Sequence, residues 1–161
     1  MQVSVSDEVR EYIVTHDTLS LATTYNGQVC STPLFYQVDS DLRLYFISDA
    51  TTRHIQNAIN NPKAAVSIFE QNQSWQSIRG VQIEGNVSRV SDKKRKQIET
   101  LYCEKFTFLK NILEAVDDED AKRVKQRFQS SNFYAVTPDF VRFIDNSRGF
   151  GFKEEYYLSH T

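Results

Sequence analysis

The spacing of hydrophobic residues predicts that the chain begins with a short helix. In SDEVREYIVTH (residues 6–16), the apolar residues Val9, Tyr12 and Ile13 fall at helical spacing. Ser6 precedes them as a candidate N-cap, and the acidic residues that follow occupy the turn in which the helix dipole favours negative charge.

The pattern then changes to the two-residue period of β-strands. TLSLATT (18–24) and VCSTPLFYQV (29–38) flank the hairpin signal YNGQ, which predicts a pair of antiparallel strands. LRLYFIS (42–48) is apolar or aromatic on both alternating faces, so we interpret it as a strand with one face on the core and the other on a partner. The later segments predicted as strands are 64–70, 80–90 and two short strands within 132–146, separated at Thr137 and Pro138.

Three further helices are predicted, over 52–60, 91–106 and 117–128. The last of them has acidic residues first and basic residues last, which is the order that the helix dipole favours. The basic run at 93–96 is interpreted as a solvated helix face and not as an anion-binding patch.

Short strands at close spacing, with a few helices and no regular alternation of strand and helix, favour a mainly β fold with flanking helices (α+β), built as an antiparallel barrel. A chain of 161 residues can bury one substantial core without disulfide or metal support. We therefore expect a single domain that spans residues 1–161.

The formal net charge of −2 comes from 19 basic and 21 acidic residues that are mixed along the chain, so no nucleic-acid partner is expected. No apolar run approaches the roughly 20 residues that span a bilayer, and the first residues lack the pattern of a signal peptide. We expect a cytoplasmic protein with no membrane partner, in which Cys30 and Cys103 stay reduced as structural thiols.

No motif assigns a catalytic residue, because GxSxG, GxxxxGK[ST] and a GxGxxG after a strand are all absent. His16, His54 and His160 lack metal-binding spacing, so no metal site is expected. GFG at 149–151 is interpreted as a flexible turn that carries Phe150 and Phe152 into an apolar contact. Aromatic residues of a β domain mostly form core or subunit interface, but some stack on planar ligands. The four candidates for stacking are Tyr36, Tyr45, Trp75 and Phe143.

The segment SDATTRHIQNAINNP (48–62) carries the most chemistry. Ile55, Ala58 and Ile59 fall on one helical face, which predicts that this face packs on the core. The residues expected to point away from the core are Arg53, Gln56, Asn57 and Asn60. Arg53 and His54 then stand in the first turn, where the helix dipole disfavours a cation by about 0.3 to 1 kcal/mol.

Two interpretations of this first turn remain open. In one, Asp49 or Thr51 caps an ordinary helix and Arg53 pairs with Asp49. In the other, the turn binds an anion such as phosphate. The donors would then be free N–H groups, the Arg53 guanidinium and the hydroxyl groups of Ser48, Thr51 and Thr52.

Residues 19–92, from LSLATTYNGQVCSTPLFYQV through RGVQIEGNVSRVSD, resemble the split-barrel FMN-binding domain of the pyridoxamine 5′-phosphate oxidase-like superfamily. The resemblance extends over roughly residues 10 to 155, and the tail VRFIDNSRGFGFKEEYYL is similar to the ending of many bacterial members. It implies an antiparallel split β-barrel and a homodimer. The dimer would bind two FMN molecules at the subunit interface, each contacted by both chains.

The resemblance also implies which residues bind the cofactor. They are Ser31, Thr32, Pro33 and Leu34 alongside the flavin ring and ribityl chain, Ile47 and Ser48 at the end of the next strand, Thr52, Arg53 and His54 in the phosphate-binding turn, and Gly80, Val81 and Gln82 near the flavin edge.

The chain departs from the family at two points. His54 stands where the family's phosphate turn commonly carries Lys, and a neutral imidazole supplies one donor and no fixed charge. This departure predicts weaker phosphate binding that depends on pH around the usual histidine pKa of about 6.5. The C-terminal Arg and His motif with which pyridoxamine phosphate oxidases hold their substrate is not evident, so that reaction is not assigned.

The expected function is therefore that of an FMN-dependent oxidoreductase-like protein acting on an unknown small molecule. A bound flavin carries the redox chemistry itself, so the absence of a catalytic triad does not exclude an enzyme. Two alternatives remain open. One is a module that binds flavin or another ligand without turnover, and the other is a split-barrel dimer that has lost its cofactor.

Overall fold

The computed structural model describes residues 4–115 and 118–159. The helices are α1 (Asp7–Thr15), α2 (Arg53–Asn60), α3 (Asp92–Lys105), α4 (Thr107–Glu114) and α5 (Glu119–Ser130), with a 3₁₀ helix at Asn146–Arg148. The strands are β1 (Thr18–Tyr25), β2 (Gln28–Phe35), β3 (Gln37–Val38), β4 (Leu44–Ser48), β5 (Lys63–Phe69), β6 (Arg79–Arg89), β7 (Asn132–Asp145) and β8 (Lys153–Tyr157).

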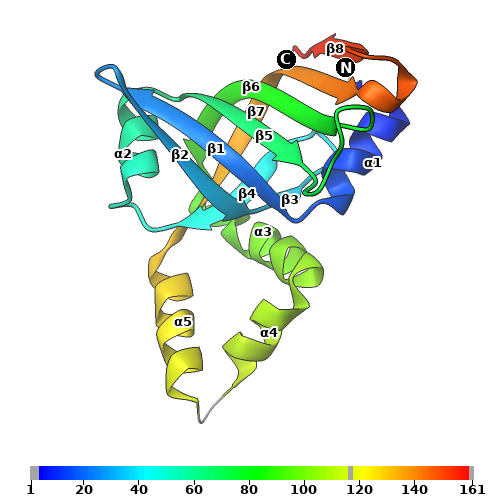
Figure 1. The fold of residues 1–161 in the computed structure, drawn as a ribbon. Coiled ribbons are helices and arrows are strands. Elements are labelled where there is room, and N and C mark those ends of the chain that lie inside the picture. Colours follow the sequence, from blue (N-terminus) through cyan, green and yellow to red (C-terminus); the bar gives the residue numbers. More distant parts are fainter. Residues whose placement is uncertain (1–3, 116–117, 160–161) are drawn as a thin grey trace.

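The strands form one antiparallel sheet in the order β2-β1-β5-β6-β7-β4-β3, and β8 pairs with the second half of β7. Only Tyr36 separates β2 from β3, so one extended segment pairs with β1 along its first part and with β4 at its end. This bridging segment curls the sheet into a split barrel (Figure 1). The predicted antiparallel split barrel of the α+β class is confirmed.

The two strands predicted within 132–146 are one strand, β7, of 14 residues. Pro138 lacks an N–H group, but the pairing with β6 shifts its register between Glu84 and Gly85, opposite the proline. A Cβ at Gly85 would lie 2.2 Å from the carbonyl oxygen of Thr137, so this close approach requires glycine. The bulge lies on β7, where Asp139 has no register partner between Pro138 and Phe140. It lets β7 continue past the proline, and the sequence of β7 alone does not reveal this.

The main core fills the barrel, and α1 covers one end of it. Val9, Tyr12 and Ile13 are buried as predicted, and the Ser6 hydroxyl accepts a hydrogen bond from the Val9 N–H at 3.4 Å. The Tyr36 hydroxyl donates to the carbonyl oxygen of Ile13, which joins α1 to the bridging segment.

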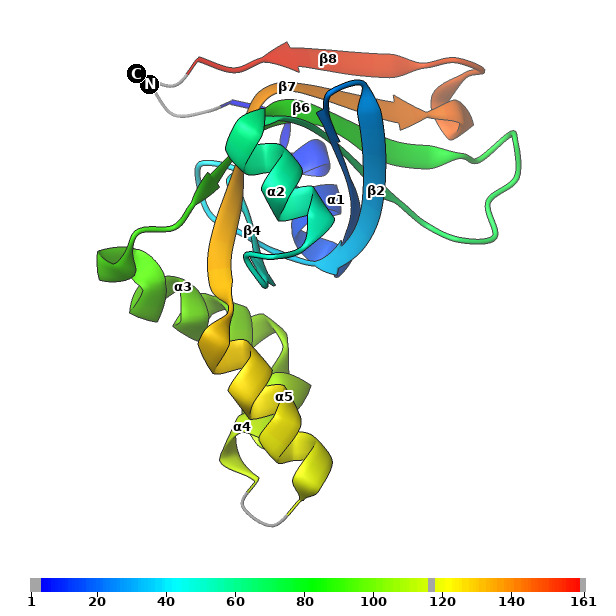
Figure 2. The same ribbon diagram turned by 90° about the vertical axis from the view of Figure 1, so that its left-hand side faces the viewer.

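α3, α4 and α5 form a helical arm that projects from the barrel (Figure 2). The arm encloses a second core with Tyr45 of β4 and Phe133 of β7. β4 thus has one face in the main core and the other against the arm. The prediction that this second face meets a partner was therefore wrong. No helix in the described part of the chain is long and apolar enough to cross a membrane.

Two elements were not predicted from the sequence, α4 and β8. α4 follows Phe106 without a side-chain cap, so it lacks the usual start signal. β8 is a strand of five residues in which exposed and half-buried positions alternate. Its place in the sheet depends on β7, to which it pairs.

Candidate functional site

α2 buries a different face from the one that its apolar residues predict. Ile55 and Ala58 are buried as expected, but Ile59 is 65 % exposed. Asn57, expected to point outward, is buried, and its Nδ2 donates to a threonine hydroxyl of β1 at 3.3 Å. His54 lies on the same buried face. The helix is rotated because these two polar side chains find hydroxyl partners in the interior.

His54 joins three elements of the fold through hydroxyl groups. Its Nε2 lies 2.8 Å from Oγ of Ser48 at the end of β4, and 3.3 Å from Oγ1 of Thr52 at the start of α2. Its Nδ1 lies 3.5 Å from Oγ1 of Thr32 on β2. These four residues, which we call the His54 cluster, all belong to the predicted cofactor-binding set.

Burial lowers the pKa of His54 below its usual value of 6.5. Within the described chain no carboxylate pairs with the imidazole, and the positive end of the α2 dipole further disfavours a charged ring. His54 is therefore neutral at pH 7. Any pH dependence that it confers on phosphate binding is expected below 6.5, and not around 6.5 as the sequence predicted.

Among residues 4–115 and 118–159, no side chain caps the first turn of α2. Thr52 is the N-cap residue, but its hydroxyl donates to the carbonyl oxygen of Asp49 at 2.8 Å. Asp49 accepts from the N–H and hydroxyl of Thr51, and these bonds lower the pKa of its carboxyl group. Arg53 is exposed, with Nη2 donating to Gln28 Oε1 at 3.2 Å. The first interpretation, a capped helix in which Arg53 pairs with Asp49, therefore does not hold. The N–H groups of the turn remain available to an anion.

The four predicted residues on β2 alternate between its two faces. Thr32 and Leu34 face inward, toward the His54 cluster and the main core respectively. Ser31 and Pro33 are exposed on the outer face, where Oγ of Ser31 lies 2.8 Å from a serine hydroxyl of β1. Only Thr32 of this segment therefore belongs to the cluster.

The remaining predicted residues lie away from the His54 cluster. Ile47 packs against the core of the helical arm, on the far face of β4. Val81 points into the main core, whereas Gly80 and Gln82 face outward on β6. β1 and β5 separate β6 from β2, a distance of about 14 Å along the sheet at the usual strand spacing. One chain does not bring these β6 residues to the cluster.

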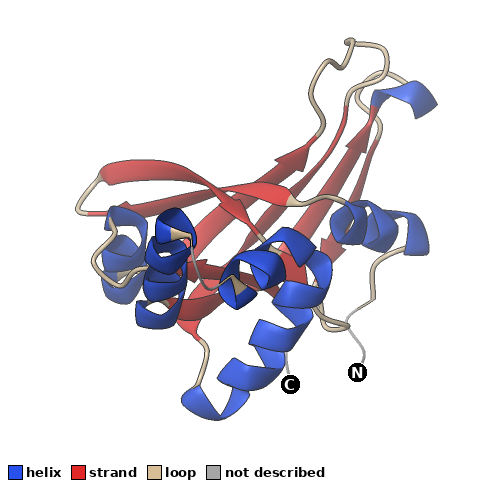
Figure 3. Ribbon diagram, turned by 90° about the horizontal axis from the view of Figure 1, so that it is seen from below, coloured by secondary structure: helices blue, strands red, loops and turns tan. Residues whose placement is uncertain are grey.

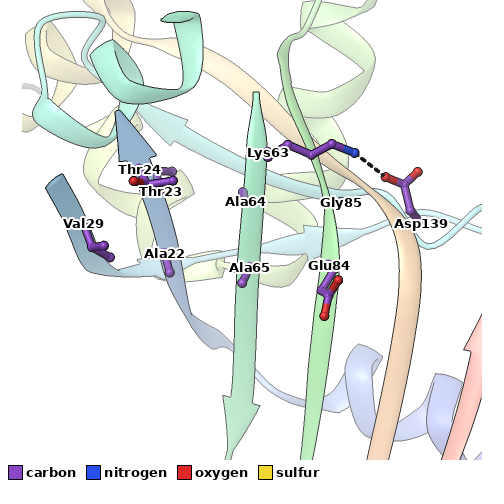
Figure 4. Close-up of a pocket in the computed structure, with 10 residues that line it drawn as sticks. All are labelled: Ala22, Thr23, Thr24, Val29, Lys63, Ala64, Ala65, Glu84, Gly85 and Asp139. Atoms are coloured by element: carbon purple, nitrogen blue, oxygen red, sulfur yellow. Dashed lines mark ion pairs between the residues drawn. The ribbon is translucent and has the colours of Figure 1, made fainter. Parts of the chain in front are cut away.

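In Figure 1 none of the described helices covers the outer face of β2, β1 and β5. On this face a hollow of about 440 Å³, which we call the Lys63 hollow, is lined by Ala22, Val29 and Ala65 (Figure 4). Lys63 and Asp139 stand at its edge with Nζ 3.6 Å from the carboxylate. This volume is within the range of about 300–1,000 Å³ for small-molecule pockets. The sequence did not predict this hollow, because its walls come from several strands whose relative register the sequence pattern does not give.

The four aromatic candidates for stacking are separated by their burial. Tyr36, Tyr45 and Phe143 are core residues, whereas Trp75 is 69 % exposed. Trp75 is therefore the one member of this set that is placed to contact a ligand.

Among the described residues, no group of histidine, cysteine and acidic side chains is arranged to hold a metal ion. His16 lies with Nδ1 2.7 Å from the carbonyl oxygen of Tyr12, and His160 falls outside the described residues. Cys30 and Cys103 are half-buried free thiols, and burial raises the pKa of Cys103.

Residues 5–145 match the sequence profile of the family described as pyridoxamine 5′-phosphate oxidase. A similar protein is the UPF0306 protein of Klebsiella pneumoniae (strain 342). It is 29 % identical over 120 residues, which cover 74 % of this chain and 70 % of the relative.

Solved structures share the fold. A conserved hypothetical protein of Mycobacterium tuberculosis has a TM-score of 0.69 at 20 % identity, covering 90 % of this chain and 88 % of its own. A FAD-binding protein of Mesorhizobium loti has a TM-score of 0.61 at 19 % identity, covering 88 % and 96 %. A heme binding protein of Mycobacterium smegmatis has a TM-score of 0.68 at 15 % identity, covering 96 % and 60 %. At these identities the likeness establishes the fold alone.

The family profile spans the barrel from α1 to the end of β7, and it includes the His54 cluster and the turn at α2. The chain therefore belongs to the pyridoxamine 5′-phosphate oxidase family.

Proposed function

We propose that the chain binds FMN and acts as a flavin-dependent oxidoreductase on a small molecule. The observation that carries this proposal is the uncapped first turn of α2, which stands between the exposed Arg53 and the His54 cluster. A phosphate group suits such a turn, because free N–H groups at a helix start and a guanidinium both donate to anions. Family membership, and the fold shared with a FAD-binding protein, support a flavin as the molecule that carries this phosphate.

The side chains at the turn fit a phosphate in both number and type. Arg53 offers two parallel donors of the kind that phosphate oxygens accept. Ser48 and Thr52 place hydroxyl groups beside the turn with their Oγ atoms 3.1 Å apart, and the Thr52 hydroxyl, which donates to the carbonyl oxygen of Asp49, would reorient to donate to a phosphate. His54 contacts both hydroxyl groups and is neutral, so its part is to position them without adding charge.

A bound flavin would supply the electron transfer itself. The chain would hold the phosphate at α2 and present the outer face of β2, with Ser31 and Pro33, beside the ring system. Exchange of hydride with a reduced nicotinamide needs no general base from the protein. The absence of an assigned catalytic residue is consistent with this chemistry.

We also propose that the working form is a homodimer. Gly80 and Gln82 stand about 14 Å along the sheet from β2, so a flavin held at α2 would meet them only on a second copy. The uncovered outer face also exposes Val29, at 68 %. Contact with a second copy would bury it. Light scattering should give twice the mass of one chain, and the mass of a single chain would contradict the dimer.

Titration of the purified chain with FMN, riboflavin, FAD and hemin tests the cofactor. Flavin fluorescence or calorimetry should show saturable FMN binding that is at least tenfold tighter than riboflavin binding, because riboflavin lacks the phosphate. Equal affinity for both flavins would show that the α2 turn does not bind the phosphate of FMN. Saturable hemin binding without flavin binding would show that the cofactor is heme and would overturn the flavin proposal. If none of the four compounds binds, the barrel has no such cofactor and acts through protein contacts.

Turnover needs a separate test. The FMN complex is mixed anaerobically with NADH or NADPH, and the flavin absorbance is followed. Bleaching by either nucleotide is expected for an oxidoreductase that takes electrons from a nicotinamide. A complex that binds FMN tightly and bleaches with neither donor would instead be a flavin-binding module.

A further inference from the structure

A second hollow lies on the outer face of the sheet, toward the opposite end of β5 and β6 from the Lys63 hollow. Its volume is about 190 Å³, and its apolar walls are Phe69 of β5, Ile78 of the following loop and Ile144 of β7. Gly80 of β6 pairs with Phe69 on one side and Ile144 on the other, so it lies at the floor. We call this space the Gly80 hollow.

The hollow is open because residue 80 has no side chain. A Cβ built at Gly80 would lie 3.4 Å from Cβ of Phe69 and 3.2 Å from the carbonyl oxygen of Ile68, so it would fill the floor. The backbone at Gly80 is not in the positive-φ region that requires glycine. The glycine is therefore explained by the space that it leaves and by the close approach of the Ile68 carbonyl, and not by a strained turn.

One side of the Gly80 hollow is polar. Gln82 follows Gly80 on the same face of β6, and its Oε1 accepts a hydrogen bond from Nη1 of Arg142 at 3.2 Å. Since the carbonyl end of this amide is engaged, its nitrogen is the atom left to donate. A carbonyl oxygen or a ring nitrogen on a ligand would accept from it.

The two loops next to the hollow each carry an exposed aromatic side chain, Trp75 and Phe150, and neither side chain lines the hollow itself. The loop that gives Ile78 to the hollow also carries Trp75, whose ring centroid lies 6.2 Å from that of Phe150 at an interplanar angle of 71°. Asn146 ties the loops together, because its N–H donates to the Ile78 carbonyl at 2.9 Å and its Nδ2 to the Trp75 carbonyl at 2.7 Å. The two loops project together beyond the end of the strands (Figure 3).

Phe150 is 85 % exposed, and it is held between two glycines with positive φ, Gly149 at 137° and Gly151 at 78°. The GFG turn does bring Phe150 to an apolar contact, but that contact is the exposed Trp75. Exposed aromatic side chains grouped beside an apolar hollow are typical of a surface that recognises another apolar group.

The volume limits what the hollow accepts. Pockets for drug-sized ligands measure about 300–1,000 Å³, so a hollow of about 190 Å³ takes one ring and not the three-ring system of a flavin. We propose that the Gly80 hollow binds a single planar aromatic ring that bears a hydrogen-bond acceptor, as in benzamide or nicotinamide. This inference rests on the proposed function, because it gives the ring class of the small molecule that would meet the flavin edge near Gly80 and Gln82.

The chain contains one tryptophan, so its fluorescence reports on the loop at Trp75. The flavin-free protein is titrated with benzamide and nicotinamide, and binding is read from Trp75 emission and from ligand-observed saturation-transfer NMR, which does not depend on tryptophan. Both methods should give a saturable signal. Gly80→Ala, which fills the floor, should weaken binding at least fivefold, while Ala65→Val in the Lys63 hollow should leave it unchanged.

Gln82→Leu tests the polar edge. It should abolish the preference for benzamide over toluene, which lacks the acceptor, while circular dichroism confirms that each variant is folded. The proposal fails if binding is linear in ligand concentration, or if Gly80→Ala and Ala65→Val weaken it equally. These titrations contain no flavin, so a failure here is distinct from a failure to bind FMN, which the flavin titration detects separately.

Discussion

Nε2 of His54 lies 2.8 Å from Oγ of Ser48, which joins the start of α2 to the end of β4 through a buried imidazole. The resemblance to the family implies a charged lysine at this position of the turn, where it would favour an anion. The imidazole turns inward, and its contacts within the cluster are hydroxyl groups. This chain therefore leaves the positive charge of the turn to Arg53 and uses the neighbouring residue to organise the interior.

The His54 contacts predict a pH-dependent stability. Burial lowers the pKa of His54 in the folded state, so the unfolded chain takes up a proton as the pH falls through about 6.5 while the folded chain resists it. Its contribution to the free energy of unfolding is constant above this range. It falls as the pH drops below 6.5, until the lower folded-state pKa is reached.

Urea unfolding of the wild type and His54→Gln between pH 4.5 and 8 measures this effect, because glutamine does not titrate. The advantage of the wild type over the variant should shrink toward low pH and stay constant above about 7.5. Curves that remain parallel across the whole range would contradict a buried, neutral His54.

The sequence predicted the barrel well, because strand alternation and the Asn-Gly hairpin are local signals. It was less reliable where partners are distant in sequence. Asn57 and His54 were not expected on the buried face of α2, because the hydroxyl groups that receive them belong to β1, β2 and β4. The spacing of apolar residues does not reveal that a polar side chain will find a hydrogen-bond partner in the protein interior.

The same limit applies to the site. The anion-binding interpretation of the α2 turn came from local charge and capping, which the chain itself displays. The Lys63 and Gly80 hollows were missed, because each lies between strands and depends on register. Gly80 illustrates this point, since its missing side chain matters only because Phe69 and Ile144 stand on either side of it.

Gly85→Ala is expected to destabilise the barrel by at least about 2 kcal/mol, in the range of core disruptions. The new Cβ would lie 2.2 Å from the carbonyl oxygen of Thr137, so β6 and β7 would have to separate at the bulge. Thermal and urea unfolding measure the change. Glu84→Ala, the exposed neighbour, is the matched control and should change stability by less than about 0.5 kcal/mol. Equal effects at both positions would show that the bulge tolerates a side chain.

Lys105→Met should loosen the helical arm. The Lys105 ammonium donates to the carbonyl oxygens of His16 at 2.5 Å and Val14 at 3.3 Å, at the end of α1, and lies 4.5 Å from the centroid of the Tyr36 ring. Methionine keeps the packing but loses these bonds, for an expected loss of about 1–3 kcal/mol. Hydrogen exchange should show faster opening of α3 and α1. The exposed Lys96→Met is the control and should leave exchange in both helices unchanged.

His54→Lys should separate affinity from stability. A lysine adds the fixed charge that the resemblance to the family implies at this turn, so FMN binding should tighten. The buried imidazole contacts with Ser48 and Thr32 are lost at the same time, and an ammonium cannot stay unpaired inside, so the melting temperature should fall. His54→Gln is the comparison, because it loses the imidazole without gaining charge. If lysine and glutamine change FMN affinity alike, charge at position 54 does not reach the ligand.

Arg53→Ala tests the residue on which phosphate binding depends most. Its guanidinium is exposed and bonded only to an amide oxygen, at 3.2 Å from Gln28, within the described chain, so its removal should leave stability nearly unchanged. FMN binding should weaken by more than about 1.5 kcal/mol, the scale of a charge-assisted hydrogen bond, while riboflavin binding stays the same. The control is Arg123→Ala on α5, which lowers the net charge equally and lies on the helical arm. If both variants weaken FMN binding equally, the effect is one of overall charge, and the turn at α2 does not hold the phosphate.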